Sequence, residues 1–387
     1  MALNNRLKSI KIINYGKAII LVRSDGTTAR YHSNWLRDNA LDSKTRDSNN
    51  GQRLISFSDI PSNTYIESAS LDKLGKNILL TFFPENKKIK FSSSWLKKYT
   101  YDVKKNKKKG WINPNLKIWK NNFSKHIPEI DYKTATSNKD SLLNWLKSLY
   151  INGFAKMNGC KIESGAIIEV ANLLGYVRET NYGKWFDVKS KINAINLAYT
   201  NLGLQPHTDN PYRDPVPTIQ ILYCIENSVT GGNSIVVDGF YAAQLLKNKS
   251  SHYFDLLSKY SARFEFKDKN KVHLESSRPL IELSPSNEII AIRFNNRSLA
   301  PITDVPYVDM KNYYKAYQLF SNIINDHKLA VKFKLNPGEC FIVDNTRVLH
   351  ARTPYSSKGT RWLQGCYVDK DGLLSTISTM LNRNFLL

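Results

Sequence analysis

A histidine and an aspartate stand two residues apart near the middle of the chain, as His207-Thr208-Asp209 in the segment LQPHTDNPYRDP. In an extended segment, the side chains at positions i and i+2 project from the same face. A strand here would therefore present an imidazole and a carboxylate together, as two ligands for one metal ion. The pair constrains the fold, because a third ligand must come from a distant segment that the chain brings alongside.

His350 offers that third ligand, in the downstream segment ECFIVDNTRVLHART. The apolar run from Cys340 to Asp344 predicts a strand, which would lead into a turn that carries this histidine. Two neutral imidazoles and one carboxylate on one face of an ion form the facial triad of non-haem Fe(II) oxygenases, which leaves the opposite face open. We therefore predict that His207, Asp209 and His350 bind iron, with dioxygen and a cosubstrate on the open face.

Arg361, in the segment GTRWLQGCY, makes the iron prediction more specific. A 2-oxoglutarate cosubstrate needs a fixed cation for the carboxylate remote from the metal, and a planar guanidinium binds a carboxylate in a bidentate way that lysine cannot. The hydroxyl of Thr230, in a Thr-Gly-Gly turn, is expected to assist. A His-x-Asp pair alone is a weak signal, and a lone histidine is more often structural. The prediction therefore depends on the ordered set of His-x-Asp, Thr-Gly-Gly, distal His and Arg.

Length and cysteine usage are those of a cytosolic globular protein. A chain of 387 residues with 41% hydrophobic residues suits about two domains and a sizeable core. Charges interrupt the first residues, MALNNRLKSIKIINYGKAIILV, so neither a signal peptide nor a membrane span is expected and the cytoplasm is the default. The cysteines lack CxxC spacing and are expected to be free thiols; they are Cys160, Cys224, Cys340 and Cys366.

The formal net charge of +23 raises a second class of function, a basic RNA- or DNA-binding protein on a degenerate cupin-like scaffold. Clustered Lys and Arg would provide the electrostatic footprint of phosphate binding. Here, however, Lys, Asn and Ile are abundant throughout, the charge is spread along the chain, and no nucleic-acid motif accompanies it. Compositional bias is the favoured interpretation, so neither a nucleic-acid partner nor a membrane partner is predicted.

Residues 1–103 are expected to form a small β-rich domain. Strand patterns run through residues 10–32 and 65–91, and a short helix is expected at 92–99. The lysine-rich run KKNKKKG cannot bury apolar surface, so residues 104–132 are expected to be a basic linker and a crossing segment. No internal repeat is apparent.

Residues 133–387 are expected to form the iron-binding domain, mainly β with flanking helices. Apolar spacing predicts helices at 139–153, 166–174, 240–247, 251–260 and 313–327. Strands are expected at 196–200, 218–226, 235–237, 289–294, 330–335, 341–343 and 362–368. Together these strands would build a double-stranded β-helix, or jelly roll, with the helices packed outside it.

Several segments resemble the γ-butyrobetaine dioxygenase and trimethyllysine dioxygenase branch of the TauD/TfdA-like Fe(II)/2-oxoglutarate dioxygenases. They are YHSNWLRDNA, NWLKSLYINGFAKMNG, NLAYTNLGLQPHTDNP, SVTGGNSIVVDGF, IRFNN and TRWLQGCYVD, and the resemblance extends from about Ile12 to Ser375. It implies iron ligation by His207, Asp209 and His350 and 2-oxoglutarate binding by Arg361 and Thr230. It also implies ascorbate as an optional reductant and a homodimer.

The resemblance further implies a pocket for a quaternary ammonium substrate. A trimethylammonium group cannot be hydrogen-bonded and is best held by aromatic faces through cation–π attraction. The aromatic cage of the branch corresponds here to Tyr182, Phe186, Tyr199 and Tyr367, with Trp185 as a substitute for Phe186. Ordinary core packing is the alternative for these rings. The carboxylate-binding asparagines of the branch correspond to Asn196 and to one of Asn295 and Asn296. The adjacent Arg297 would suit a phosphonate, or else it is a surface residue.

The chain departs from the branch in its first domain, where the branch carries a structural zinc held by three cysteines and a histidine. The matching positions here are Ala40, Asp42, Thr45 and Lys87. None of these replaces a thiolate well, so no zinc is predicted and the apolar core alone is expected to hold this domain.

The predicted function is that of a Fe(II)- and 2-oxoglutarate-dependent hydroxylase acting on a small trimethylammonium zwitterion. γ-Butyrobetaine, which would give L-carnitine, is the first expected substrate because the cage and asparagine positions match that enzyme. The alternative is 2-(trimethylamino)ethylphosphonate or another quaternary ammonium compound, which the presence of Arg297 favours.

Overall fold

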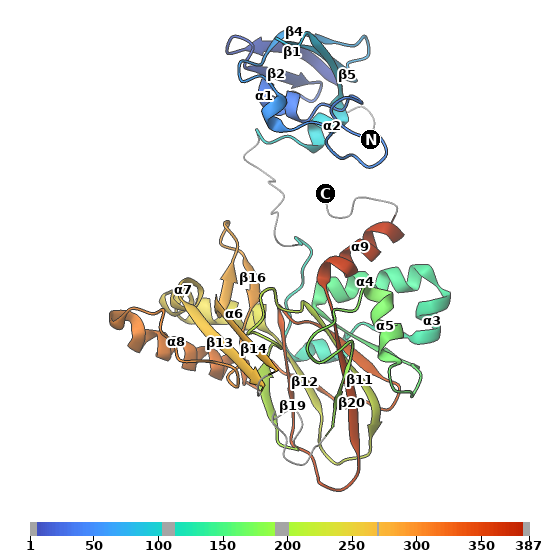
Figure 1. Cartoon of the computed structure of the whole chain (residues 1–387), viewed down its shortest axis with the longest axis vertical. Coiled ribbons are helices and arrows are strands. Elements are labelled where there is room, and N and C mark those ends of the chain that lie inside the picture. Colours follow the sequence, from blue (N-terminus) through green and yellow to red (C-terminus); the bar gives the residue numbers. More distant parts are fainter. Residues whose placement is uncertain (1–5, 103–112, 190–200, 269–270, 382–387) are drawn as a thin grey trace. The chain divides into compact units, whose positions relative to one another are not determined.

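The computed structural model describes residues 6–102, 113–189, 201–268 and 271–381 of the chain (Figure 1). The chain divides into two compact units, Met1–Gly110 and Trp111–Leu387. Every residue predicted to bind iron, cosubstrate or substrate belongs to the larger unit.

The smaller unit consists of two three-stranded antiparallel sheets, each followed by a short helix. The first sheet contains β1 (Leu7–Ile13), β2 (Ala18–Arg23) and β3 (Thr28–His32) and leads into α1 (Ser33–Asp38). The second contains β4 (Tyr65–Leu71), β5 (Asn77–Phe83) and β6 (Lys87–Ser92) and leads into α2 (Ser93–Lys98). A short 3-10 helix, η2 (Phe57–Asp59), stands between them in the sequence. The apolar faces of both sheets share one core.

The two halves of this unit repeat the same β-β-β-α order. The helices have the related sequences SNWLRD and SSWLKK, and their tryptophans, Trp35 and Trp95, contact each other with ring centroids 5.5 Å apart. In each half the carbonyl of a turn glycine, Gly16 or Gly75, accepts a hydrogen bond from the first strand of the other half, at 2.8 and 2.7 Å. The expectation of no internal repeat is therefore wrong. The halves share their topology but few residues outside the helices.

The positions that match the zinc ligands of the branch form polar contacts in this unit. Lys87 Nζ lies 3.0 Å from Asp42 Oδ1, and the hydroxyl of Thr45 donates to Asp42 Oδ2 at 2.7 Å. Ala40 is fully buried. Within the described part of this unit, no group of three potential metal ligands meets. The absence of a structural zinc stays a prediction.

Two sheets form the centre of the larger unit (Figure 1). The six-stranded sheet has the order β7 (Glu129–Asp131), β8 (Phe154–Asn158), β18 (Cys340–Asp344), β11 (Ile219–Asn227), β20 (Arg361–Val368), β9 (Phe186–Val188). The four-stranded sheet has the order β10 (Leu204–His207), β19 (Val348–Arg352), β12 (Ser234–Asp238), β17 (Val331–Phe333). Neighbouring strands are antiparallel except β7 and β8, which pair in parallel.

Buried side chains from both sheets meet in one core cluster. Val236 and Val348 come from the four-stranded sheet, and Cys224, Phe341 and Leu363 come from the six-stranded sheet. Because side chains alternate along a strand, each sheet turns one face toward this cluster and the other face away from it. The two sheets therefore face each other across shared apolar side chains.

Helices cover the outside of this pair of sheets. One core cluster joins the six-stranded sheet to α3 (Tyr132–Ser137), α4 (Lys139–Asn152), α5 (Ile167–Leu174) and α9 (Lys370–Met380). These helices lie together on one side of the unit (Figure 1). Another cluster joins α6 (Gly239–Lys249), α7 (Ser251–Lys259) and α8 (Tyr307–Ile324) to two hairpins, β13 (Ser261–Asp268) with β14 (Val272–Pro279) and β15 (Ile281–Leu283) with β16 (Ile289–Ile292). A 3-10 helix, η3 (Asn121–Lys125), precedes β7.

The mixture of strands and helices agrees with the predicted fold class. Helix α4 begins and ends as expected: the Asn138 side chain accepts from Ser141 N at 2.9 Å, and Gly153 takes a left-handed φ of 71° at the end. The expected turn at His350 is wrong, because this residue lies inside the buried strand β19. The hairpin β13–β14 and helix α9 are additional elements. The strand expected at 196–200 lies outside the described residues.

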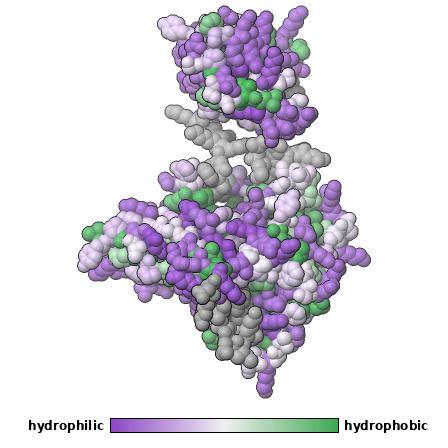
Figure 2. Space-filling view, viewed as in Figure 1, coloured by the Kyte–Doolittle hydropathy of each residue, from purple (hydrophilic) through white to green (hydrophobic). Residues whose placement is uncertain are grey.

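No helix in the described part of the chain is both long and apolar enough to cross a membrane. Figure 2 shows mainly hydrophilic residues on the visible face, with small separate apolar areas. The cytoplasmic location stays a prediction.

Candidate metal centre and its cavity

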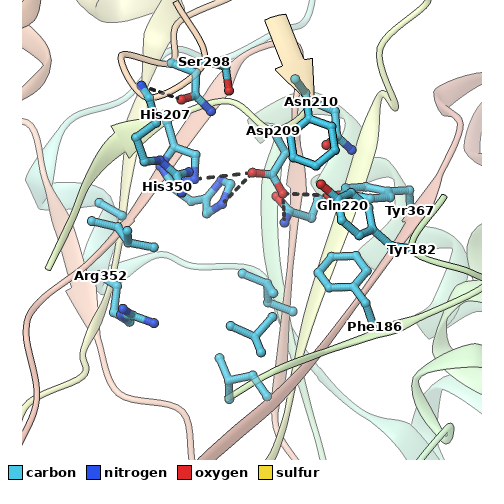
Figure 3. Close-up of a pocket in the computed structure, with 18 of the residues that line it drawn as sticks. Tyr182, Phe186, His207, Asp209, Asn210, Gln220, Ser298, His350, Arg352 and Tyr367 are labelled. Atoms are coloured by element: carbon cyan, nitrogen blue, oxygen red, sulfur yellow. Dashed lines mark hydrogen bonds and ion pairs between the residues drawn. The ribbon is translucent and has the colours of Figure 1, made fainter. Parts of the chain in front are cut away.

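The pairing of β10 with β19 brings the three predicted iron ligands together. His207 ends β10 and is the direct register partner of His350 in β19. The Nε2 atoms of His207 and His350 lie 3.4 and 3.7 Å from Asp209 Oδ1, and the two imidazole centroids are 4.3 Å apart (Figure 3). The three side chains thus converge on one point from β10, from the second residue after it and from β19, which is far away in the sequence.

The protonation states of these side chains suit a metal ion. His207 Nδ1 lies 2.7 Å from the carbonyl oxygen of Gln205, so it donates its proton there and leaves Nε2 as the free lone pair. Burial lowers the pKa of His207, and burial together with His207 lowers the pKa of His350 to about 3. Burial would raise the pKa of Asp209, but the adjacent imidazoles and Arg297 outweigh it and the pKa is lowered. Two neutral imidazoles and one carboxylate are a donor set that fits Fe(II).

The backbone of Asp209 is fixed by Asn345, in the loop that precedes β19. Asn345 Oδ1 accepts from Asp209 N at 2.7 Å, and Asn345 Nδ2 donates to the carbonyl of Asp209 at 3.0 Å. The peptide of a ligand that follows the end of a strand is thereby held in place. Asn345 has no spacing relation to the His-x-Asp pair, and sequence analysis missed it.

A cavity of about 490 Å³ opens beside the triad. Two buried arginines line it, Arg352 in β19 and Arg361 in β20, and their guanidinium carbons lie 4.9 and 5.5 Å from the ring centroid of Tyr355. Burial and the charge of Arg352 lower the pKa of Arg361 to about 10. The Nε atom of Arg361 is buried without a hydrogen-bond partner in the described part of the chain. Buried cations are stable when an anion pairs with them, so this end of the cavity fits a carboxylate.

Thr230 is exposed and does not line the cavity. Its backbone N–H donates to Ser356 Oγ at 3.2 Å. The Thr-Gly-Gly turn reaches Arg361 through Gly232, where a Cβ atom would lie only 3.1 Å from Cδ and Nε of that arginine. The turn therefore makes room for the Arg361 side chain, and a contact of the Thr230 hydroxyl with the cosubstrate stays a prediction.

Aromatic rings form another part of the cavity wall. Phe186 lies 5.5 Å from Tyr182 and 5.5 Å from Tyr367 between ring centroids, and all three line the cavity (Figure 3). Phe186 fits there because β20 has Gly365 beside it, where a Cβ atom would meet the ring at 2.5 Å. Trp185 is 39% exposed and does not line the cavity, so the structure brings Phe186 into the cluster instead. Tyr199 lies outside the described residues.

Two further rings line the cavity and were missed by sequence analysis. Tyr212 and Phe266 stack with centroids 5.0 Å apart, and Phe266 lies 6.1 Å from Tyr182. The hydroxyl groups of Tyr182 and Tyr212 are 3.1 Å apart, and Tyr212 donates to Asn210 Oδ1 at 2.7 Å. Tyr212 follows the metal motif closely in HTDNPY, which is a usable signal. Phe266 comes from the unexpected hairpin and gives none.

Of the residues expected to bind the anionic end of a substrate, some line the cavity and others do not. Asn295 is buried in the cavity wall, where its Nδ2 donates to the carbonyl of Thr208 and its Oδ1 accepts from Arg297 N, both at 3.1 Å. Asn296 is exposed and does not line the cavity. Arg297 lines the cavity, and its pKa is lowered by burial, partly offset by Asp209 and the nearby tyrosines. Asn196 lies outside the described residues.

Residues 117–367 match the family described as taurine catabolism dioxygenase TauD, TfdA family, and the chain belongs to this family of dioxygenases. It is 31% identical to a γ-butyrobetaine dioxygenase of Pseudomonas sp. (strain AK-1), over 94% of each chain. It is 30% identical to the human γ-butyrobetaine dioxygenase, over 93% of each chain. The mouse mitochondrial trimethyllysine dioxygenase is 29% identical over 91% of this chain and 83% of its own.

Among solved structures, an asparagine oxygenase crystallised with Fe(II), 3-hydroxyasparagine and succinate is 18% identical, with a TM-score of 0.48 over 62% of this chain and 83% of its own. The predicted resemblance to the γ-butyrobetaine and trimethyllysine dioxygenases and the predicted dioxygenase class are confirmed. His207, Asp209 and His350, the residues predicted to bind iron, lie close enough together in this chain to hold a metal ion.

Proposed function

We propose that the chain is a Fe(II)- and 2-oxoglutarate-dependent hydroxylase of a small trimethylammonium zwitterion. One observation carries the proposal: a single cavity is lined by the His207, Asp209 and His350 triad, by buried guanidinium groups and by an aromatic cluster. Each part fits a different partner, namely the metal, the cosubstrate and the substrate cation. The two facing sheets that carry them are proposed to be a double-stranded β-helix.

His207, Asp209 and His350 would hold the iron, and Arg361 would bind the remote carboxylate of 2-oxoglutarate. When bound, the iron supplies the chemistry that couples dioxygen reduction and 2-oxoglutarate decarboxylation to the hydroxylation of a C–H bond, with succinate and CO₂ as coproducts. The residues of the chain are proposed to position the reactants. They fix the cosubstrate at one end of the cavity and keep one carbon of the substrate beside the open face of the metal.

The cluster of Tyr182, Phe186 and Tyr367, extended by Tyr212 and Phe266, would hold the trimethylammonium group. Aromatic faces attract a quaternary ammonium ion by roughly 2 kcal/mol or more when the site is desolvated. Asp209 and Glu265 are the acidic residues of the described cavity wall. The first proposed substrate is γ-butyrobetaine, hydroxylated to L-carnitine, and the relatives named γ-butyrobetaine dioxygenase support this choice.

A second substrate, 2-(trimethylamino)ethylphosphonate, is favoured by the position of Arg297. This guanidinium lines the cavity close to Asp209 and the tyrosines, whereas Asn296 is exposed. A phosphonate dianion gains more from a buried guanidinium than a carboxylate does, because it carries more charge and more acceptor oxygens. Arg297→Gln should therefore weaken phosphonate turnover more than betaine turnover if the phosphonate is the natural substrate.

The test is 2-oxoglutarate turnover, measured as succinate together with the hydroxylated product, across γ-butyrobetaine, trimethyllysine and 2-(trimethylamino)ethylphosphonate. Isosteric compounds with a tert-butyl group in place of trimethylammonium serve as controls, because they keep the shape and lose the charge. Turnover of one zwitterion and not of its tert-butyl control, which lacks the cationic charge, is the expected result. Equal turnover of a zwitterion and its tert-butyl control would show that the aromatic cluster does not recognise the trimethylammonium charge.

The partners in this proposal are dioxygen and a small quaternary ammonium compound, without a nucleic-acid partner. Homodimer formation and ascorbate as a reductant stay predictions. A protein that binds RNA or DNA in a salt-sensitive way, and that shows no Fe(II)- and 2-oxoglutarate-dependent absorption band under anaerobic conditions, would belong to the alternative class of basic binding proteins.

A further inference from the structure

The two oxygens of the Asp209 carboxylate have different surroundings. Oδ1 faces the imidazoles of His207 and His350, at 3.4 and 3.7 Å. Oδ2 accepts two hydrogen bonds on the other side, from Gln220 Nε2 at 2.5 Å and from the hydroxyl of Tyr367 at 2.9 Å (Figure 3). One oxygen is therefore turned toward the metal position and the other is occupied by protein donors.

These two donors come from the opposite sheet. Gln220 in β11 and Tyr367 in β20 are direct register partners in the six-stranded sheet, so their side chains lie next to each other on one face. His207 and His350 belong to the four-stranded sheet. Both donors are almost fully buried, with 2% and 3% of their surface exposed, so water does not compete for Oδ2. The carboxylate is held from both sheets at once.

The orientation of the Gln220 amide follows from the chemistry of its partner. A carboxylate only accepts hydrogen bonds, so the amide must turn its NH₂ group toward Asp209. Its Oε1 is then left buried, with no hydrogen-bond partner among the residues that the structure describes. An unpaired buried carbonyl destabilises a fold, and an aliphatic residue such as the neighbouring Leu222 would avoid that cost. Packing does not explain a glutamine at this position, whereas the contact with Asp209 does.

We infer that Gln220, together with the Tyr367 hydroxyl, is a positioning residue that holds Asp209 as a ligand through one oxygen. A carboxylate free to rotate could bind an ion through both oxygens and would then occupy a second coordination position. With Oδ2 held back, that position stays open for the cosubstrate or dioxygen. The inference depends on the proposed function for the identity of the ion, and on the two hydrogen bonds to Oδ2 for the geometry.

The experiment compares Gln220→Met with Gln364→Met. Both variants remove a fully buried glutamine from neighbouring strands, but Gln364 donates to Ser164 and Asp187, at 2.9 and 3.0 Å, and does not contact a ligand. Anaerobic titration with Fe(II), and with Co(II) as a spectroscopic probe, gives the metal affinity and the visible spectrum of the bound ion. Thermal unfolding of the metal-free proteins gives their stability.

Gln220→Met is expected to bind both metals about 10- to 100-fold more weakly, the usual effect of losing a contact that orients a ligand, and to shift the Co(II) absorption bands. Its metal-free unfolding temperature should change less than that of Gln364→Met, because the hydrogen bond that it loses to Asp209 is offset by the removal of the unpaired Oε1. Gln364→Met should show the reverse, with normal metal affinity and a lower unfolding temperature, because it loses satisfied hydrogen bonds. Tyr367→Phe, which keeps the ring and removes the hydroxyl, should weaken metal binding in the same direction.

The Asp209→Ala variant distinguishes a failure of the proposed function from a failure of the positioning role of Gln220. If the parent protein binds no metal in the site, the proposed function fails. If the parent binds Fe(II), Asp209→Ala does not, and both Gln220→Met and Tyr367→Phe bind it with parental affinity and an unchanged Co(II) spectrum, the positioning role of Gln220 is overturned while the iron site stands. Should Gln220→Met fail to fold, the same titration on Tyr367→Phe decides between these outcomes.

Discussion

Replacing Arg361 by lysine keeps a positive charge in the cavity but removes the planar group that binds a carboxylate through two parallel hydrogen bonds. Arg361 is 6% exposed, so water cannot make up for a lost contact. A hydrogen bond to a charged partner contributes roughly 1.5–3 kcal/mol. Losing one of two should therefore weaken 2-oxoglutarate binding by roughly 10- to 150-fold, at about 1.4 kcal/mol for each factor of ten.

The assay is anaerobic titration of the Fe(II)-loaded protein with 2-oxoglutarate, followed by the visible band that forms when the cosubstrate binds the metal. 2-Oxopentanoate is the matched control, because it can bind the metal in the same way and lacks the remote carboxylate. Arg361→Lys should leave the 2-oxopentanoate affinity unchanged. Equal losses for both oxoacids, or no loss for either, would show that Arg361 does not bind the remote carboxylate.

Other consequences of the structure can be checked in the same way. Asp209→Ala should abolish hydroxylation and metal binding with an unchanged far-UV circular dichroism spectrum, and full hydroxylation by this variant would refute the iron site. Gly365→Ala places a Cβ atom 2.5 Å from the Phe186 ring, so it should destabilise the fold by roughly 1–3 kcal/mol and raise KM for a trimethylammonium substrate without changing 2-oxoglutarate affinity. In the smaller unit, burial acts to raise the pKa of Asp42, but hydrogen bonds from Thr45 and Lys87 outweigh it and the pKa lies below 3.8. Asp42→Asn should therefore unfold at a lower temperature than the parent at pH 5, with a difference that shrinks as the pH falls below that value; no difference at pH 5 would contradict this. Elemental analysis of the purified protein should find less than stoichiometric zinc, and one zinc per chain would disprove the predicted loss of that site.

The candidate metal ligands could be identified from the sequence because the arrangement of two of them depends on short-range geometry. His207 and Asp209 are two residues apart on an extended segment, and His350 follows an apolar run. The pairing of β10 with β19, which places His350 opposite His207, could not be predicted from the sequence. A turn was expected at His350, whereas in the structure residues 345–347 form the loop after β18 and β19 begins immediately after them.

The choice between Trp185 and Phe186 could not be made from the sequence, because the two aromatic residues are adjacent and nothing local fixes which ring faces the cavity. The pairing of β9 with β20 decides it by setting Phe186 against Gly365. The β13–β14 hairpin was missed for a related reason. Its second strand carries charged or polar residues on both faces, so its pattern does not alternate clearly, yet its first strand contributes Phe266 to the cavity.

The candidate residues of the site come from two sheets. This explains why only some of them could be predicted from the sequence. The four-stranded sheet carries His207 and His350, which are proposed to bind the metal and belong to a recognisable motif. The six-stranded sheet carries Arg361, Tyr367 and Gln220, which are proposed to bind the cosubstrate, to bind the substrate and to orient Asp209, respectively. Gln220 is a single polar residue in an apolar strand, and no spacing rule distinguishes it from a structural glutamine such as Gln364. Its role follows only from the packing of one sheet on the other, because that packing brings an amide within 2.5 Å of a carboxylate eleven positions earlier in the chain.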